Sequence, residues 1–328
     1  CQNLCMHKLF KQILTSKVYE AAIETPLEES AFLSQLLNNR VLLKREDLQP
    51  VFSFKIRGAY NRIANLSKAE RELGNITASA GNHAQGVAFS GQKLGIDTTI
   101  VMPVTTPAIK IAAVKSFAAK VVLFGDSYSE AAEHCADLVS QSGMVFIPPF
   151  DDQLVIAGQG TVADELIRQS AGRIDAVFVP VGGGGLLAGV AAFIKELCPN
   201  IKVIGVEPVD SDAMAQSLAA GHRVKLDSVG IFADGVAVRE VGKLTFEICR
   251  QHVDEIILVD VDEICSAVKS VYQATRSIVE PAGALATAGL KKYVRERKVT
   301  GQSLVAINSG ANMNFDRLRY VAERTLIG

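Results

Sequence analysis

The sequence predicts an α/β protein built around parallel β-sheet. The alternation of strand and helix patterns predicts this class, and the chain length and the absence of a linker predict how many domains it forms. From about residue 75 onward, short β-branched runs alternate with longer segments of helical pattern. This alternation is the order that parallel strands with crossover helices require. The chain has 328 residues and no fixed-period repeat or low-complexity linker. It is therefore long enough for two domains that pack closely against each other.

The predicted strands can be read in chain order. They are residues 75–80, 98–104, 120–124, 144–150, 175–181, 201–207, 255–260 and 303–310. Between them, residues 129–142 and 186–198 show helical patterns. Pro148 and Pro149 interrupt regular structure, so we expect a boundary there. We predict a large domain of residues 1–73 and 151–328 and a small domain of residues 74–150.

Composition excludes several classes of protein. Lys and Arg number 34 and Asp and Glu number 35, so the chain carries no electrostatic footprint for nucleic acid. No apolar run approaches the roughly 18 residues that cross a membrane. The six cysteines include no C-x-x-C pair, which predicts reduced thiols and no zinc site. We expect a cytoplasmic protein, without a bound metal, that acts on a small neutral or zwitterionic molecule.

The stretch "VFSFKIRGAY" places Lys55 after two phenylalanines, at the start of a segment with amphipathic helical pattern. Partial burial lowers the pKa of a lysine because the charged form becomes costly. A lysine of this kind can react with an aldehyde. On this stretch alone, a lysine that lays its stem along an apolar surface is the simpler interpretation.

A run of glycines follows the predicted strand at residues 175–181 and leads into an apolar helix. Consecutive glycines let backbone N–H groups curl toward an anion at a helix N-terminus, which predicts a phosphate site. Glu207, about twenty residues later, is where a dinucleotide-binding fold places its ribose ligand. An NAD-dependent dehydrogenase is therefore an alternative, although the spacing is not G-x-G-x-x-G.

Two further polar turns follow predicted strands, at "SAGNHAQG" and at "INSGANMNF". Ligands gather at the carboxyl ends of parallel strands, so Asn82, the glycine run, Glu207 and Ser309 are expected to converge on one crevice. A lone histidine is more often structural, so His83 is not assigned as a base. A lysine for an aldehyde, glycines for a phosphate and a serine for a ring nitrogen together predict a pyridoxal phosphate enzyme.

The motifs "SFKIRGA", "SAGNHAQG", "GGGGL" and "NSGAN", in this order, resemble those of the fold-type II pyridoxal phosphate enzymes. Within that group the chain is most similar to the threonine dehydratases of biosynthetic type. The resemblance implies two open, mostly parallel twisted sheets flanked by helices, as in tryptophan synthase β. It also implies the conversion of L-threonine to 2-oxobutanoate and ammonia on the way to isoleucine, with L-serine giving pyruvate as a side activity.

The resemblance assigns roles to individual residues. Lys55 binds the cofactor aldehyde and moves a proton, Asn82 contacts the ring hydroxyl, and Ser309 faces the ring nitrogen. The substrate carboxylate is expected near Ser79, Ala80, Gly81 and His83. The cofactor phosphate is expected at Gly182, Gly183, Gly184, Gly185 and Leu186. Glu280 matches an acidic residue near the cofactor, although it could equally be a solvated carboxylate that opens a helix before Pro281.

Departures from related enzymes refine these expectations. Serine racemases carry an acid/base serine at the position of Ala80, so the alanine favours elimination over racemisation. Serine racemase or serine dehydratase activity remains an alternative. Biosynthetic relatives continue into a regulatory domain that senses isoleucine, and we expect this chain, which stops at Gly328, to lack it and to be insensitive to isoleucine. The resemblance also implies a homodimer or homotetramer.

Overall fold

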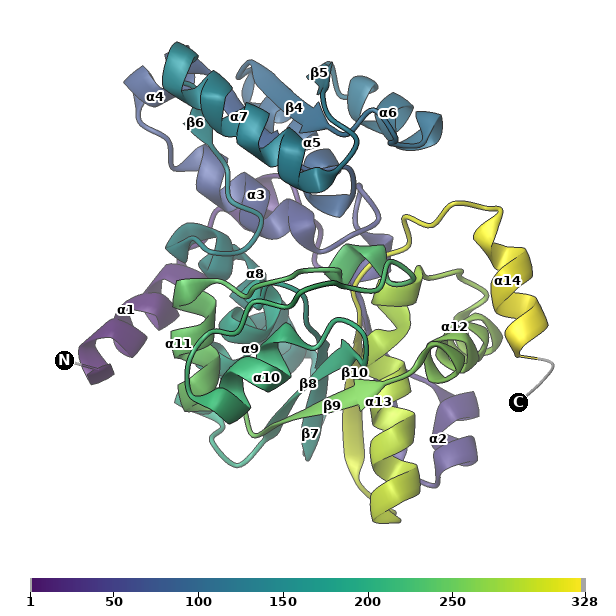
Figure 1. The fold of residues 1–328 in the computed structure, drawn as a ribbon. Helices are drawn as coiled ribbons and strands as arrows, with labels where there is room; N and C mark the ends of the chain where they lie inside the picture. Colours follow the sequence, from purple (N-terminus) through teal and green to yellow (C-terminus); the bar gives the residue numbers. More distant parts are fainter. Residues whose placement is uncertain (1, 326–328) are drawn as a thin grey trace.

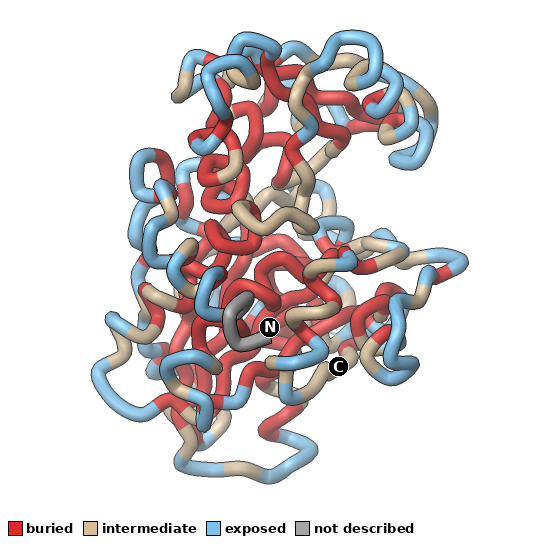
Figure 2. The backbone as a smooth tube through the Cα atoms, turned by 90° about the vertical axis from the view of Figure 1, so that its left-hand side faces the viewer, coloured by how far each residue is buried: buried red, intermediate tan, exposed pale blue. Residues whose placement is uncertain are grey.

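The chain folds into two lobes, each built around its own β-sheet (Figure 1). The computed structural model describes residues 2–325, with side chains described from residue 7 onward. Figure 2 shows that the buried residues lie in the interiors of both lobes. In the part of the chain that is described, no helix has the length and apolar character needed to cross a membrane.

The larger lobe contains a six-stranded sheet in the order β1-β2-β10-β7-β8-β9. Its strands are β1 (Leu27–Glu29), β2 (Arg40–Arg45), β7 (Ala176–Pro180), β8 (Lys202–Pro208), β9 (Glu255–Val259) and β10 (Ser303–Asn308). All neighbours run parallel except β1, which pairs antiparallel with β2. The sheet is therefore mostly parallel, as predicted.

Helices cover both faces of this sheet, and the strand residues alternate between the two resulting cores. Val305 and Ile307 of β10 belong to one core, whereas Leu304 and Ala306 belong to the other. This is the two-residue period of a strand that is buried on both faces. The helices of the first core are α1 (Gln2–Leu14), α8 (Gln153–Gln169), α9 (Gly185–Leu197), α10 (Ala213–Ala220) and α11 (Lys243–His252). Those of the second are α2 (Ala31–Leu37), α12 (Val261–Thr275), α13 (Pro281–Arg297) and α14 (Arg317–Arg324).

The smaller lobe contains a parallel four-stranded sheet in the order β5-β4-β3-β6. Its strands are β3 (Asn75–Ala78), β4 (Thr98–Met102), β5 (Lys120–Leu123) and β6 (Val145–Phe146). The helices of this lobe are α4 (Lys68–Leu73), α5 (Asn82–Leu94), α6 (Ala108–Lys115) and α7 (Tyr128–Ser142). Short 3₁₀ segments elsewhere are η1 (Val18–Glu20), η2 (Glu46–Leu48) and η3 (Asp234–Val236).

Helix α3 (Lys55–Ala64) connects the lobes, because it packs against α5 of the small lobe and α8 of the large one (Figure 1). Its contact with α8 is close: a Cβ on Gly158 would lie 2.6 Å from the carbonyl oxygen of Arg57 and 2.7 Å from the Cα of Gly58. Only glycine permits this approach of two helix backbones. Ala59 and Ile63 of α3 belong to the core of the small sheet.

All eight predicted strands and both predicted helices are present. Strands β1 and β2 were not predicted. In β2, Lys44 and Arg45 interrupt the apolar pattern, yet both side chains are buried through ion pairs. Strand prediction from hydrophobic pattern does not detect a strand of this kind. The division at residues 73/74 and 150/151 stays a prediction.

Candidate active site

A cavity of about 630 Å³ lies between the lobes. Strands β3, β7 and β10 end at it, each followed by one of the polar turns singled out in the sequence. The structure brings all thirteen residues to which the resemblance assigns a role to the wall of this cavity. They are Lys55, Ser79, Ala80, Gly81, Asn82, His83, Gly182, Gly183, Gly184, Gly185, Leu186, Glu280 and Ser309.

Lys55 is the first residue of α3, as its amphipathic pattern predicts. Its Nζ donates a hydrogen bond to the carbonyl oxygen of Pro149 at 2.9 Å. Burial lowers the pKa of Lys55 to about 8, although the negative charge of Glu280 opposes that shift. About a tenth of the amine is therefore neutral at pH 7 and about half at pH 8, and the neutral form is the one that reacts with an aldehyde.

The glycine run forms the turn between β7 and α9. Gly184 has φ +94°, in the left-handed region that favours glycine. A Cβ on Gly183 would lie 2.2 Å from the ring of Phe150, and the hydroxyl of Thr245 donates to the carbonyl oxygen of Gly183 at 2.6 Å. Phe150 and Thr245 therefore hold the glycine run in place. No side chain caps the N-terminus of α9, so its N–H groups are available to an anion in the cavity.

The second turn lies between β3 and α5. His83 is buried, and its Nε2 lies 2.9 Å from the carbonyl oxygen of Ile147, which makes Nε2 the donor. Burial and the nearby charge of Lys55 lower the pKa of His83 to about 3, so the ring is neutral. A neutral ring cannot neutralise a carboxylate. The N–H groups of Ser79 and Gly81 already donate within the protein, so this turn offers an anion the N–H groups at the uncapped start of α5 rather than a positive charge.

Asn82 takes part in a chain of buried polar groups. Its Nδ2 donates to the carboxyl group of Glu280 at 2.5 Å, and its Oδ1 accepts from Asn312 at 2.7 Å. Glu280 precedes α13, but only 2% of it is exposed. The interpretation of Glu280 as a solvated carboxylate is therefore wrong. Burial raises the pKa of Glu280 to about 8, despite the hydrogen bond from Asn82.

We expect Glu280→Gln to flatten the pH dependence of the free energy of unfolding. A pKa raised from 4.5 to about 8 means that the folded state binds a proton that the unfolded state has lost between these values. The stability from this group is therefore complete below pH 4.5 and is lost as the pH rises through 8. Urea unfolding at several pH values between 4.5 and 8 measures the slope. Glu296→Gln, at an exposed position of the same helix, is the control. An unchanged slope in Glu280→Gln would show that Glu280 is ionised in the fold.

Ser309 follows β10 and connects the large sheet to the segment before Lys55. Its backbone carbonyl oxygen accepts from the N–H of Phe54 at 3.2 Å, and its hydroxyl lies 3.4 Å from the carbonyl oxygen of Ala282. The side chain is buried at the cavity wall. The hydrogen bond between Phe54 and Ser309 therefore links the serine to the start of the helix that carries Lys55.

The prediction that Glu207 joins this crevice is wrong. Glu207 does not line the cavity. Its carboxyl oxygens accept hydrogen bonds from the N–H groups of Met214 at 2.9 Å and Ala215 at 2.8 Å. The residue therefore caps the start of α10 behind the glycine turn. The sequence did not reveal this because strand-end position says nothing about the direction of the side chain.

Several cavity residues were not identified from the sequence. Phe150 supports the glycine turn, and Tyr128 lies at the start of α7. Lys110 of α6 and Asp234 of η3 form an ion pair of 2.7 Å that joins the two lobes. The cysteines Cys135, Cys198, Cys249 and Cys265 are free thiols, whereas Cys1 and Cys5 lie outside the described side chains.

Comparisons with known proteins agree with the resemblance. Residues 18–310 match the family model described as pyridoxal-phosphate dependent enzyme. An L-threonine dehydratase of biosynthetic type from Burkholderia multivorans is 54% identical, covering 99% of this chain and 65% of that protein. A chloroplastic biosynthetic threonine dehydratase from Solanum lycopersicum is 56% identical, covering 98% of this chain and 53% of that protein. The chain thus spans about half to two thirds of these relatives.

Solved structures show the same similarity. The processed form of threonine deaminase isoform 2 from Solanum lycopersicum superposes with a TM-score of 0.97 at 51% identity, covering 98% of this chain and 89% of that chain. The serine racemase of Dictyostelium discoideum reaches 0.85 at 33% identity, covering 94% of this chain and 98% of that chain. The two-sheet fold is therefore one that these solved proteins share.

Proposed function

The chain belongs to the pyridoxal-phosphate dependent enzyme family, and from that premise we propose that it is a threonine dehydratase. The reaction converts L-threonine to 2-oxobutanoate and ammonia, with L-serine giving pyruvate more slowly. The observation that carries the proposal is that the lysine, the glycine turn and the strand-end serine line one cavity. The relatives from Burkholderia multivorans and Solanum lycopersicum, both above 50% identity, carry the name threonine dehydratase. The dehydrogenase alternative loses its support.

The residues at the cavity fit pyridoxal phosphate. The turn at residues 182–185 has no side chains and lies at the N-terminus of a 13-residue helix, which suits a phosphate. A Cβ on Gly183 would collide with Phe150, and a Cβ on Gly184 would collide with Met214. Close packing around the turn therefore requires glycine at both positions. Lys55, with its lowered pKa, supplies the amine that an aldehyde requires.

When bound, pyridoxal phosphate supplies an aldehyde for an amine and a ring that accepts electrons from the bond to the Cα proton. We assign Lys55 to the aldehyde, Ser309 to the ring nitrogen and the glycine turn with Leu186 to the phosphate. Asn82 is assigned to the ring hydroxyl, and Glu280 holds the Asn82 amide in place through its hydrogen bond. The turn at Ser79, Ala80, Gly81 and His83 is assigned to the substrate carboxylate.

Lys55 has two tasks in this proposal. It holds the cofactor and, once the substrate amine has taken its place, its neutral amine accepts the Cα proton. A pKa of about 8 suits both tasks, because the group can bind and release a proton near neutral pH.

The proposal is tested by adding pyridoxal phosphate to the purified chain. A visible absorption band of lysine-bound pyridoxal should form, and L-threonine should then yield 2-oxobutanoate and ammonia in equal amounts. The protein without cofactor and the cofactor without protein are the controls. If the band forms but neither threonine nor serine is deaminated, the family assignment stands and the dehydratase proposal fails.

Racemisation of serine should be negligible, because Ala80 has no group that can transfer a proton on the second face of the cofactor. L-Serine is incubated in deuterium oxide, and the recovered serine is examined by chiral chromatography and mass spectrometry. Ala80→Ser is the matched variant, and we expect it to raise D-serine formation above that of the parent chain. D-serine forming as fast as pyruvate in the parent would contradict the elimination assignment.

We also propose a homodimer or homotetramer, a cytoplasmic location and the two-domain division given above. The division is supported by the sheets, since all four strands of the small sheet lie between residues 75 and 146. The location is supported by the free thiols. Among the relatives, the proteins from Arabidopsis thaliana and Saccharomyces cerevisiae are named as chloroplastic and mitochondrial.

A further inference from the structure

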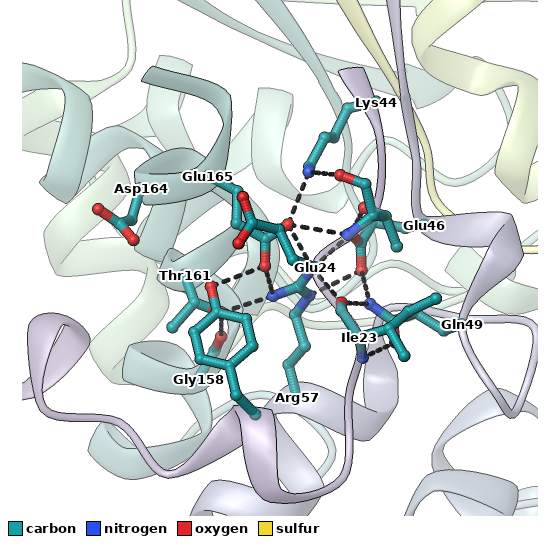
Figure 3. A network of polar contacts seen from close by, with 12 residues as sticks. Ile23, Glu24, Lys44, Glu46, Gln49, Arg57, Gly158, Thr161, Asp164 and Glu165 are labelled. Carbon is teal, nitrogen blue, oxygen red and sulfur yellow. Dashed lines mark hydrogen bonds and ion pairs between the residues drawn. The ribbon is translucent and has the colours of Figure 1, made fainter. Parts of the chain in front are cut away.

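A buried ionic cluster lies beside α3 (Figure 3), and none of its residues lines the cavity. We define the Arg57 cluster as Lys44, Glu46, Arg57 and Glu165. All four side chains are fully buried, and their two positive and two negative charges balance. The cluster joins β2 and η2 of the large sheet to α3 and α8. The function proposed above does not use it.

Arg57 makes two bidentate contacts in this cluster. Its Nε and Nη2 donate to Glu46 at 2.8 and 2.7 Å, and its Nη1 and Nη2 donate to Glu165 at 2.5 and 2.9 Å. Nη1 also donates to the hydroxyl of Thr161 at 3.0 Å. Because each of the two carboxylates accepts two hydrogen bonds from the guanidinium, they fix its plane as well as its position. The backbone of α3 at residue 57 is held accordingly.

Lys55 and Arg57 lie on opposite sides of α3. Residues two apart on an α-helix are separated by about 200° around its axis. Lys55 therefore points into the cavity while Arg57 points into the cluster. The contact between Gly58 and Gly158 brings the backbones of α3 and α8 close together. On the side of α5, a Cβ on Gly86 would lie 3.1 Å from the carbonyl carbon of Lys55.

Backbone groups also hold the first turn of α3: the N–H of Phe54 donates to the carbonyl oxygen of Ser309 at 3.2 Å, and the N–H of Gly58 donates to the side chain of Gln159 at 3.1 Å. Within this turn, ion pairs hold the side chain of Arg57, whereas the amine of Lys55 donates to the carbonyl oxygen of Pro149. We propose that Arg57 is a positioning residue that fixes the rotation of the first turn of α3 and thereby the place of the Lys55 amine in the cavity. This inference rests on the proposed function, because it gives Lys55 its task.

Lysine cannot replace Arg57 in this role, because an ammonium group has no planar fork for two carboxylates. Arg57→Lys therefore loosens the first turn of α3 while keeping the charge of the cluster. The matched control is Arg45→Lys. Arg45 is also buried and grips Asp47 through Nε at 3.0 Å and Nη2 at 2.8 Å, but its side chain makes no hydrogen bond to α3.

The first measurement needs neither cofactor nor substrate. Lys55 of the cofactor-free protein is labelled by competitive acylation at a series of pH values, and the extent is followed by mass spectrometry. In Arg57→Lys the midpoint should rise by about half a unit or more toward that of an ordinary lysine, since a loosened amine is better hydrated. In Arg45→Lys it should not move, although both variants should lower Tm.

The second measurement is steady-state kinetics of the cofactor-loaded enzyme with L-threonine. Arg57→Lys should lower kcat by about 10- to 100-fold while KM changes by about twofold or less, because misplacement of a reacting group affects the chemical step. Arg45→Lys should retain the parent kcat.

Two outcomes decide the matter. If Arg57→Lys lowers Tm as Arg45→Lys does but leaves the Lys55 midpoint and kcat unchanged, Arg57 is structural only and the inference is overturned. If Arg57→Lys does not fold, Glu165→Gln, which keeps one acceptor oxygen for the guanidinium, is measured in the same way with the same criteria. Absence of threonine turnover in the parent would sink the proposed function, whereas the labelling midpoint would still test the position of Lys55.

Discussion

Replacing Lys55 with alanine should reduce threonine deamination by about 10⁴-fold or more, because one side chain both holds the cofactor and moves the Cα proton. Lys55 is the lysine at the cavity wall whose pKa burial lowers to about 8. Lys110 and Lys225 also line the cavity, but Lys110 is paired with Asp234 and Lys225 is exposed. The rate of 2-oxobutanoate formation by the variant loaded with excess pyridoxal phosphate gives the size of the loss.

Lys291→Ala is the matched control for this loss. Lys291 is also partly buried, but its amine donates to Ser266 and Ser270 on α12, away from the cavity. Its removal should leave turnover unchanged. Borohydride reduction of the loaded parent enzyme, followed by peptide mapping, identifies the lysine that carries the cofactor. An adduct on any residue other than Lys55 would sink the assignment.

Gly184→Ala should weaken the binding of pyridoxal phosphate by about 10- to 100-fold, which corresponds to roughly 1–3 kcal/mol of backbone strain and displacement. Gly184 has φ +94°, and an added Cβ would lie 2.7 Å from Cε of Met214 and 2.9 Å from Oγ1 of Thr245. The turn must shift to relieve these contacts, and its N–H groups then no longer point together at the phosphate. Titration of the cofactor-free protein, followed by absorbance, measures the affinity.

Gly221→Ala separates the effect of the turn from the general cost of a left-handed alanine. Gly221 ends α10 with φ +73°, and an added Cβ there meets nothing within 4 Å. This variant should lose about 1 kcal/mol of stability and keep its affinity for the cofactor. Equal losses of affinity in both glycine variants, or no loss in Gly184→Ala, would show that the turn does not hold the phosphate.

Much of the cavity wall could be predicted because each group occupies a recognisable place along the chain. A glycine run between a strand and a helix, and polar turns after strands, are local patterns. Parallel strands bring their carboxyl ends to one edge of a sheet, so local patterns also predict a common site. The turns after β3, β7 and β10 meet at the cavity in this way.

Side-chain direction and partner choice were not available from these patterns. Glu207 follows a strand as Ser309 does, yet it turns away from the cavity to cap α10. Glu280 could have been solvated, but the amide of Asn82, 198 residues earlier in the chain, contacts it in the buried wall. Such contacts depend on how two lobes close around the space between them.

The sequence by itself determined the order of strands and helices from residue 75 onward, the class of cofactor and the lysine expected to bind it. These three features depend on residue types at short spacing, and the hydrophobic periodicity and the positions of glycines indicate them. Only the tertiary structure decided that β2 is a buried strand, that Lys55 has a pKa of about 8, and that Arg57 is gripped by two glutamates. Burial of a charged group is stable only when opposite charges from distant segments surround it, and the sequence does not state which segments meet.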